Sequence, residues 1–220
     1  DRLLGELINN IKPAYKSIKF NNIRFNSKDC KTNDIFFSIQ GNKLKGNNYI
    51  KDAIKNGSKI IISNLNFEGF NKEKILFIKN KNPRKALADA ASNFYKKKPK
   101  NIIALTGTNG KTSISNFFYQ ILSLSKKKVA AIGTLGVLSK KIKLKTNNTT
   151  IDPIKMHQIL QKLKNSNIDN VIIEASSHGL KQHRLDGLNL KTALFTNLTR
   201  DHLDYHKTFK DYLNSKLILF

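Results

Sequence analysis

A seven-residue segment has the composition and the setting of a phosphate-binding loop. Its residues are Thr106-Gly107-Thr108-Asn109-Gly110-Lys111-Thr112, with an apolar run at 101–105 before them and a segment of helical spacing after them. Two glycines let the backbone turn several N–H groups toward one anion, and the N-terminus of a helix adds a partial positive charge. Lys111 can reach the outer phosphates of a nucleotide, and the Thr112 hydroxyl can bind Mg²⁺.

A glycine-rich structural turn is the alternative interpretation of this segment. Leu105 stands where the common pattern G-x-x-x-x-G-K-[ST] has its first glycine. The preceding strand, the following helix and the Lys-Thr pair are nevertheless in register, and this context favours a nucleotide site. We therefore predict that residues 107–112 bind ATP together with Mg²⁺.

Two further polar clusters follow apolar runs. Glu174 begins the cluster 174–179 directly after the run 171–173, and the cluster 197–202 follows the run 193–195. Because ligands of parallel sheets bind beyond the carboxyl ends of the strands, we expect these clusters to lie near the phosphate loop. A carboxylate at that position is costly without a cation, so a Glu174 with a neighbouring cation is favoured over a partly exposed strand-end Glu174.

The apolar runs and turn residues predict two α/β domains. In the first part of the chain we expect strands at 35–39, 59–62 and 75–78, and helices at 49–56 and from Pro83 onward. In the second part we expect strands at 101–105, 129–132, 171–173 and 193–195, and helices at 112–124 and 156–163. Continuous apolar strands separated by helices indicate a parallel sheet that is covered on both faces.

The charged stretch 96–100, which contains Pro99, is the predicted domain boundary. The fold class that follows is α/β: a small mixed α/β N-terminal domain at 1–97, then a P-loop-type, mostly parallel sheet domain with helices on both faces at 98–220. The chain begins at Asp1 rather than Met, and residues 217–220 read as helix. We therefore expect a fragment whose central domain is truncated.

The net charge of +25 suggests nucleic acid as a possible partner, because lysine and arginine neutralise phosphates. Only five of the 40 basic residues are arginine, the side chain that contacts phosphates and base edges with two hydrogen bonds. The lysines are spread along the chain among many Asn and Ile residues, as an AT-rich genome would encode. We expect no nucleic-acid partner.

The sequence also argues against a membrane protein. No apolar run approaches the roughly 20 residues that span a bilayer, and the first ten residues lack the features of a signal peptide. Cys30 is the single cysteine, which excludes an internal disulfide and fits a reducing compartment. We expect a cytoplasmic protein.

Three further segments indicate to which class of nucleotide-binding protein the chain belongs. They are Asn148-Thr149-Thr150-Ile151-Asp152-Pro153, then Glu174-Ala175-Ser176-Ser177-His178-Gly179-Leu180 with Gln182 and Arg184, and the run from Phe195 to His206, FTNLTRDHLDYH. Together with GTNGKT, which alone would also fit folylpolyglutamate and cyanophycin synthetases, they resemble the MurE family of Mur ligases, the UDP-N-acetylmuramoyl-tripeptide synthetases. The resemblance covers essentially the whole chain, more loosely in residues 1–97.

The resemblance implies an ATP-dependent amide-forming ligase of peptidoglycan synthesis. Such an enzyme adds the third amino acid, meso-diaminopimelate or L-lysine, to UDP-N-acetylmuramoyl-L-alanyl-D-glutamate through an acyl phosphate. It implies catalytic roles for Lys111, Glu174, His202 and Lys216. The implied Mg²⁺ ligands are Thr112, Glu174, His202 and, if carbamylated, Lys216. For His202 a structural histidine, and for Lys216 a solvated helix lysine, remain the alternatives.

The resemblance also implies the substrate-binding residues. In the second domain they are Asn148, Thr149, Thr150, Ser176, Gln182 and Arg184, and Arg184 suits a carboxylate or a pyrophosphate because its guanidinium binds such groups with two hydrogen bonds. In the first domain we expect Ser27 and Gln40 near uracil or its diphosphate. Asn26 and Lys28 replace the family's usual Asp and Arg on either side of Ser27, so the resemblance is weaker at this position.

Several alternatives stay open at this stage. They are a MurF- or MurD-type ligase, a basic nucleic-acid-binding P-loop protein, and a regulatory module that binds nucleotide without catalysis. We expect a monomer that binds the UDP-muramoyl dipeptide and an amino acid. Mur ligases select the amino acid with a C-terminal domain that is absent here, so we expect residues 1–220 alone to be catalytically inactive.

Overall fold

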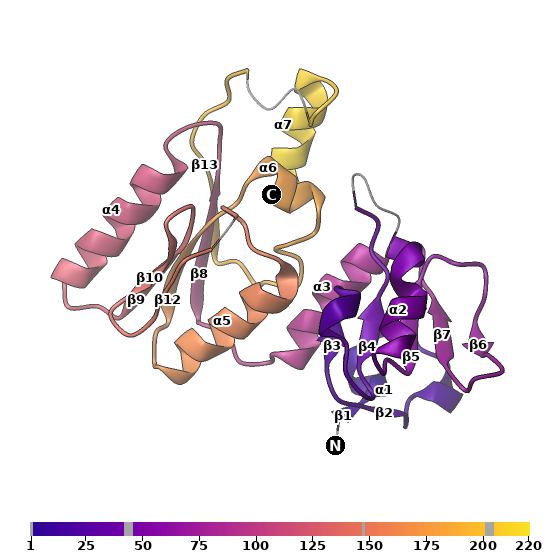
Figure 1. Cartoon of the computed structure of the whole chain (residues 1–220). Helices are drawn as coiled ribbons and strands as arrows, with labels where there is room; N and C mark the ends of the chain where they lie inside the picture. Colours follow the sequence, from indigo (N-terminus) through magenta and orange to yellow (C-terminus); the bar gives the residue numbers. More distant parts are fainter. Residues whose placement is uncertain (1, 42–45, 147, 201–204) are drawn as a thin grey trace. The chain divides into compact units, whose positions relative to one another are not determined.

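The computed structural model describes residues 2–41, 46–146, 148–200 and 205–220. The chain divides into two compact units, Asp1–Phe94 and Tyr95–Phe220 (Figure 1). The boundary expected from the charged stretch 96–100 lies three residues after this division. Each unit is described below by itself.

The first unit is built on a five-stranded sheet with the order β3-β4-β5-β7-β6. All neighbouring strands are parallel except the pair of β6 and β7. The strands are β3 (Ile23–Arg24), β4 (Ile35–Phe37), β5 (Ile60–Ser63), β6 (Gly69–Phe70) and β7 (Leu76–Lys79). A two-stranded antiparallel sheet joins β1 (Arg2–Leu3) to β2 (Lys19–Phe20).

Short helices complete the first unit. They are α1 (Leu4–Leu7), α2 (Ile50–Lys55), α3 (Pro83–Phe94), and the 3₁₀ turns η1 (Pro13–Tyr15), η2 (Ser27–Asp29) and η3 (Gly46–Tyr49). Ile50 and Ala53 of α2 pack against Phe36 and Ile61 of the sheet. Helix α3 starts with proline, which lacks the N–H group that a first helical turn leaves unpaired. The strands and helices expected from the apolar runs in this unit are confirmed to within two residues.

The second unit is a six-stranded sheet with the order β11-β10-β9-β12-β8-β13. Strands β9, β12, β8 and β13 are parallel to one another, and β10 and β11 are antiparallel additions at one edge. The bounds are β8 (Asn101–Thr106), β9 (Val129–Gly133), β10 (Gly136–Ser139), β11 (Lys143–Leu144), β12 (Asn170–Glu174) and β13 (Thr192–Phe195).

Helices cover both faces of this sheet (Figure 1). On one face, Met156 and Leu160 of α5 (Pro153–Asn165) pack against Ile102 and Ile173. On the other face, Phe118 of α4 (Lys111–Leu124) packs against the cluster of Leu105, Ala131 and Ile172. The predicted fold class, α/β with a mostly parallel sheet covered on both faces, is therefore confirmed.

Three features differ from the expectation or were not predicted. The β9–β10–β11 edge is antiparallel, because a short turn after Gly133 reverses the chain. Helices α6 (Ser177–Lys181) and α7 (Phe209–Leu217) were not predicted as such. The expectation of helix at 217–220 is wrong: α7 ends at Leu217, and the ring of Phe220 lies against that of Phe195, with centroids 6.2 Å apart.

The reason is that the last apolar side chains turn back toward the sheet. Leu219 packs against the main core cluster of the second unit. The backbone N–H groups of Leu219 and Phe220 donate to carbonyls three residues earlier, the tight pattern in which many helices end. Among the described residues, no helix is long and apolar enough to cross a membrane.

Candidate active site

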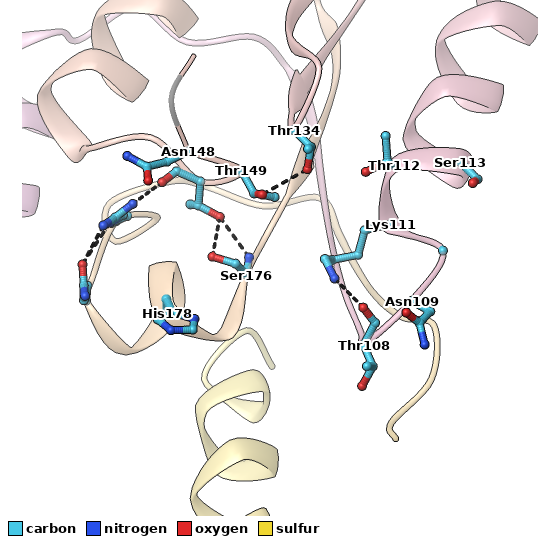
Figure 2. A pocket seen from close by; sticks show the side chains of 14 residues that line it. Thr108, Asn109, Lys111, Thr112, Ser113, Thr134, Asn148, Thr149, Ser176 and His178 are labelled. Atoms are coloured by element: carbon cyan, nitrogen blue, oxygen red, sulfur yellow. Dashed lines mark hydrogen bonds between the residues drawn. The ribbon is translucent and has the colours of Figure 1, made fainter. Parts of the chain in front are cut away.

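A polar pocket of about 480 Å³ lies at the carboxyl ends of the parallel strands of the second unit. Figure 2 shows the phosphate-loop side chains on one side of it and Asn148, Ser176 and His178 on the other, with Thr134 and Thr149 between them. Its lining comes from four segments: 108–113, Thr134, 148–150, and Ser176, His178, Gln182 and Arg184. The topology thus brings together most of the residues that the sequence singled out.

The phosphate loop is anchored by the segment after β13. Gly107 has φ +152°, and a Cβ there would lie 1.8 Å from Thr196 Oγ1, so this position requires glycine. The backbone N–H of Asn109 donates to Asn197 Oδ1 at 2.9 Å. Lys111 Nζ donates to the carbonyls of Gly107 and Thr108, both at 2.8 Å. The Lys111 amine therefore lies across the loop, where an anion could attract it.

The carboxylate of Glu174 is 1% exposed and is held by hydroxyl and amide donors. Thr112 Oγ1 donates to Oε2 at 2.9 Å, and Thr134 contacts both oxygens, through its hydroxyl at 3.1 Å and its N–H at 3.2 Å. The buried carboxylate thus accepts hydrogen bonds from two hydroxyls and one N–H and forms no salt bridge in the described part of the chain. Because Mg²⁺ prefers oxygen ligands, the Thr112 hydroxyl and the Glu174 carboxylate fit such an ion.

The opposite wall of the pocket is fixed by Thr150. Its hydroxyl donates to the Glu174 carbonyl at 3.0 Å and accepts from the backbone N–H of Ser176 at 2.9 Å. The Ser176 hydroxyl caps α6 by accepting from Gly179 N at 3.1 Å. Thr149 extends this wall toward the Glu174 carboxylate, because its hydroxyl lies 3.0 Å from that of Thr134. The hydroxyls of Thr149 and Thr134 thus connect this wall to the Glu174 carboxylate.

Arg184 and Gln182 line the same side of the pocket as Thr150, and their side chains contact each other. Two guanidinium nitrogens of Arg184 donate to Gln182 Oε1, at 3.2 and 2.7 Å, and a third contacts the carbonyl of Thr150. Burial lowers the pKa of the Arg184 guanidinium, although arginine keeps its charge at neutral pH. Gln182 Nε2 donates to the Tyr205 hydroxyl at 3.2 Å. The Arg184 guanidinium, held in place by Gln182 and Thr150, therefore adds a positive charge to this side of the pocket.

Lys216 lies behind the phosphate loop and is 1% exposed. Its Nζ donates to the carbonyl of Gly107 at 2.7 Å, the same carbonyl that accepts from Lys111, and it lies 4.4 Å from the ring centre of Tyr212. The alternative interpretation of Lys216 as a solvated surface lysine is therefore wrong. Its expected carbamylation stays a prediction.

The remaining expected site residues lie elsewhere. His202 falls outside the described residues. Ser27 and Gln40 belong to the first unit, where Ser27 is buried and Gln40 is exposed. Near Gln40 in the sequence, Ser38 Oγ donates to Asn47 Oδ1 at 2.6 Å, and Asn47 Nδ2 donates to Asn64 Oδ1 at 3.0 Å. The sequence did not single out this polar chain, in which Ser38 and Asn64 follow β4 and β5.

Three pocket residues were missed by the sequence reasoning: Thr134, Ser113 and His178 as a lining residue. Thr134 follows the carboxyl end of β9, so the rule that pointed to Glu174 would also have found it. Ser113 directly follows the phosphate loop. The ring of His178 stacks on that of Tyr205, with centroids 3.8 Å apart, a contact between distant segments that no local pattern reveals.

Comparison with known proteins gives consistent matches. Residues 105–220 match the model of the Mur ligase middle domain, and residues 19–95 match that of the Mur ligase family, catalytic domain. The UDP-N-acetylmuramoyl-L-alanyl-D-glutamate--2,6-diaminopimelate ligase of Clostridium tetani is 42% identical over 99% of this chain and 46% of its own length. The ligase of the same name from Rickettsia montanensis is 40% identical over 96% of this chain and 44% of its length.

Solved structures show the same likeness. A structure with that ligase name superposes with a TM-score of 0.80 at 28% identity, over 95% of this chain and 42% of its own. The MurF ligase from Thermotoga maritima in complex with ADP superposes with a TM-score of 0.55 at 17% identity, over 90% and 42%, which is a likeness of fold alone. The chain spans less than half the length of the curated relatives it matches.

Proposed function

Because the chain belongs to the Mur ligase family, we propose that it is the substrate- and ATP-binding part of a ligase that extends UDP-N-acetylmuramoyl-L-alanyl-D-glutamate by a third amino acid. The observation that carries this proposal is one pocket lined by both the phosphate loop and Arg184. The buried Glu174 carboxylate lies directly behind its lining, hydrogen-bonded to Thr112 and Thr134. The names of the relatives favour diaminopimelate over lysine as the added amino acid.

The nucleotide takes the side of the pocket formed by the phosphate loop. The backbone N–H groups of residues 107–112 and the N-terminus of α4 surround the phosphates. Lys111 leaves the carbonyls of Gly107 and Thr108 and meets the outer phosphates. These contacts neutralise the anion that a second anion, the substrate carboxylate, must approach.

Two ligands of the proposed metal site are Thr112 and Glu174, whose Oγ1 and Oε2 atoms lie 2.9 Å apart. His202 and a carbamylated Lys216 join them by family resemblance. When bound, Mg²⁺ supplies positive charge between the phosphates and the substrate carboxylate. Thr134 would keep the Glu174 carboxylate oriented when the ion is bound, because its hydroxyl and N–H both contact that carboxylate.

The UDP-muramoyl dipeptide takes the opposite wall. Its candidate contacts are Asn148, Thr149, Thr150, Ser176, Gln182 and Arg184 in this unit, and Ser27 and Gln40 in the first unit. The Arg184 guanidinium, held by Gln182 and Thr150, is oriented to bind a carboxylate or a phosphate with two hydrogen bonds. In the reaction, these residues hold the substrate carboxylate next to the γ-phosphate of ATP in the orientation that the attack requires.

The proposed chemistry has two steps. An oxygen of the substrate carboxylate attacks the γ-phosphorus of ATP, the bond to the β–γ bridging oxygen breaks, and ADP leaves. The amine of the incoming amino acid then attacks the acyl carbon, phosphate leaves, and the amine loses a proton as the amide forms. The chain spans less than half of its relatives' length, so we expect residues 1–220 alone to bind both substrates without joining them.

Two other aspects belong to the same proposal. We place the protein in the cytoplasm, since its nucleotide-linked substrates are made there and its single cysteine, Cys30, is buried and free. We also propose that it is monomeric. A MurF- or MurD-type ligase is the second candidate, but the likeness to MurF at 17% identity concerns the fold alone.

Calorimetry on residues 1–220 tests this function. We expect saturable binding of a non-hydrolysable ATP analogue that requires Mg²⁺ and is lost in Lys111→Ala, and separate binding of UDP-N-acetylmuramoyl-L-alanyl-D-glutamate that is lost in Arg184→Ala. Lys126→Ala, an exposed lysine away from the pocket, is the matched control. A folded chain that binds neither ligand would refute the proposal.

A further inference from the structure

A buried chain of side chains connects the two walls of the pocket from behind. The Tyr212 hydroxyl on α7 lies 3.1 Å from Thr108 Oγ1 in the phosphate loop. The ring of His206 packs on that of Tyr212, with centroids 5.2 Å apart, and its Nε2 lies 2.9 Å from Ser177 Oγ, at the start of α6. Tyr212, His206 and Ser177 are each at most 2% exposed, and none of them lines the pocket.

The hydrogen-bond directions at the Thr108 end follow from valence. Thr108 Oγ1 donates to the carbonyl of Thr199 at 3.2 Å and accepts from the N–H of Thr199 at 3.0 Å. Because a hydroxyl has one proton and two lone pairs, the Tyr212 hydroxyl donates to the remaining lone pair when Thr108 donates to Thr199. Tyr212 therefore supplies the third hydrogen bond to the hydroxyl of Thr108, the residue that joins the phosphate loop to the segment after β13.

The directions at the His206 end follow in the same way. The Ser215 hydroxyl donates to the carbonyl of Asp211 at 2.7 Å, so it can only accept from His206 Nδ1, 3.4 Å away. Asp211 Oδ2, also 3.4 Å from Nδ1, is a second acceptor. In the neutral imidazole, a proton on Nδ1 leaves Nε2 as an acceptor for the Ser177 hydroxyl. His206 thereby ties α7 to the helix that carries His178 and follows Ser176.

These contacts are in a buried region, where a lost partner leaves other polar groups without hydrogen bonds. We propose that Tyr212 and His206 are positioning residues that hold the phosphate loop against α6, so that the nucleotide wall and the substrate wall keep a fixed separation. The expected effect on nucleotide affinity rests on the proposed function. The connection from the phosphate loop through Tyr212 and His206 to α6 does not.

Hydrogen exchange on the chain without nucleotide tests the connection itself. Ser177→Ala removes one hydroxyl that touches neither the loop nor the pocket. We expect the amides of residues 107–112 to exchange about fivefold faster in this variant, the effect of losing one hydrogen bond, while the amides of β9 and β12 keep their rates. Unchanged exchange in the loop, or an equal rise over the whole unit, would overturn the proposal.

Binding of a Mg²⁺–ATP analogue gives the second readout. Tyr212→Phe keeps the ring and removes the donor to Thr108, and we expect affinity to fall about fivefold. Tyr119→Phe is the matched control, because the Tyr119 ring on α4 packs against the sheet cluster of Leu105, Ala131 and Ile172 and does not line the pocket. Equal affinity in Tyr212→Phe and wild type would overturn the role in nucleotide binding. If wild type binds no analogue, the proposed function fails, and the exchange rates still decide the connection.

Discussion

The carboxylate of Glu174 accepts a hydrogen bond from the hydroxyl of Thr112 at 2.9 Å, across 62 positions of the sequence. Glu174 is the last residue of β12, and Thr112 is the second residue of α4. Helix α4 follows β8, the strand that pairs in parallel with β12. The pairing places both side chains at one edge of the sheet. A carboxylate and a hydroxyl therefore lie together beside the phosphate loop, the arrangement on which the proposed Mg²⁺ site rests.

Glu174→Gln should weaken the effect of Mg²⁺ on nucleotide binding. Glutamine keeps the size of the side chain but removes the charge that attracts the ion. We expect the Mg²⁺ concentration needed for half-maximal analogue binding to rise about tenfold or more, since even residues outside the first coordination sphere contribute that much to metal affinity. Titration of Mg²⁺ at fixed analogue concentration measures it. Equal Mg²⁺ requirements in variant and wild type would remove Glu174 from the metal site.

Gly133→Ala should destabilise the second unit because it collides with the same carboxylate. A Cβ at this position would lie 2.0 Å from Glu174 Oε1 and 2.3 Å from Cδ. We expect the free energy of unfolding to fall by about 1–3 kcal/mol, the usual effect of overpacking, measured by urea denaturation. In a Glu174→Ala background the added methyl group has room, so the same substitution should change stability little. A similar loss in both backgrounds would rule out this collision.

The sequence allowed much of the second unit to be predicted, because its signals are local. The run 171–173 is apolar throughout and became the buried strand β12, and Gly107 and Gly110 stand where the loop must turn. The rule that polar residues gather at the carboxyl ends of parallel strands then placed Glu174 near Thr112.

Contacts between distant segments could not be predicted. Tyr212 and Thr108 are 104 positions apart, and nothing near either residue indicates their hydrogen bond. Lys216 resembled any other lysine in a chain rich in them, and only the packing of α7 shows it buried against the carbonyl of Gly107. In the first unit, Ser27 and Gln40 depended on family resemblance, because the departures at Asn26 and Lys28 weakened the local signal.

Asp169→Asn should reduce the acid sensitivity of the protein. The pKa of Asp169 is lowered, first by its hydrogen bond from Lys164 Nζ, at 2.6 Å, and also by the backbone N–H of Lys100. A carboxyl group with a lowered folded-state pKa stabilises the fold above its unfolded pKa of about 3.9, and this contribution is lost as the pH falls through the folded value.

We therefore expect wild type to have the higher Tm at neutral pH. The difference from Asp169→Asn should disappear as the pH falls below about 3.9, the unfolded value, and through the lowered folded-state pKa. Thermal scans monitored by circular dichroism measure both proteins across this range. Lys164→Met should remove much of the same pH dependence, because it deletes the main partner. A Tm difference that stays constant with pH would contradict the assignment.

Arg184→Lys should separate substrate binding from nucleotide binding. Lysine keeps the positive charge but has no planar group that could contact Gln182 Oε1 and the Thr150 carbonyl while facing a ligand. We expect the affinity for the UDP-muramoyl dipeptide to fall about tenfold, as when a charge-assisted pair of hydrogen bonds becomes a single contact. Calorimetry with each ligand measures the effect, and the affinity for the ATP analogue should stay within twofold or so of wild type. Equal losses for both ligands would mean that Arg184 supports the whole pocket rather than the substrate wall.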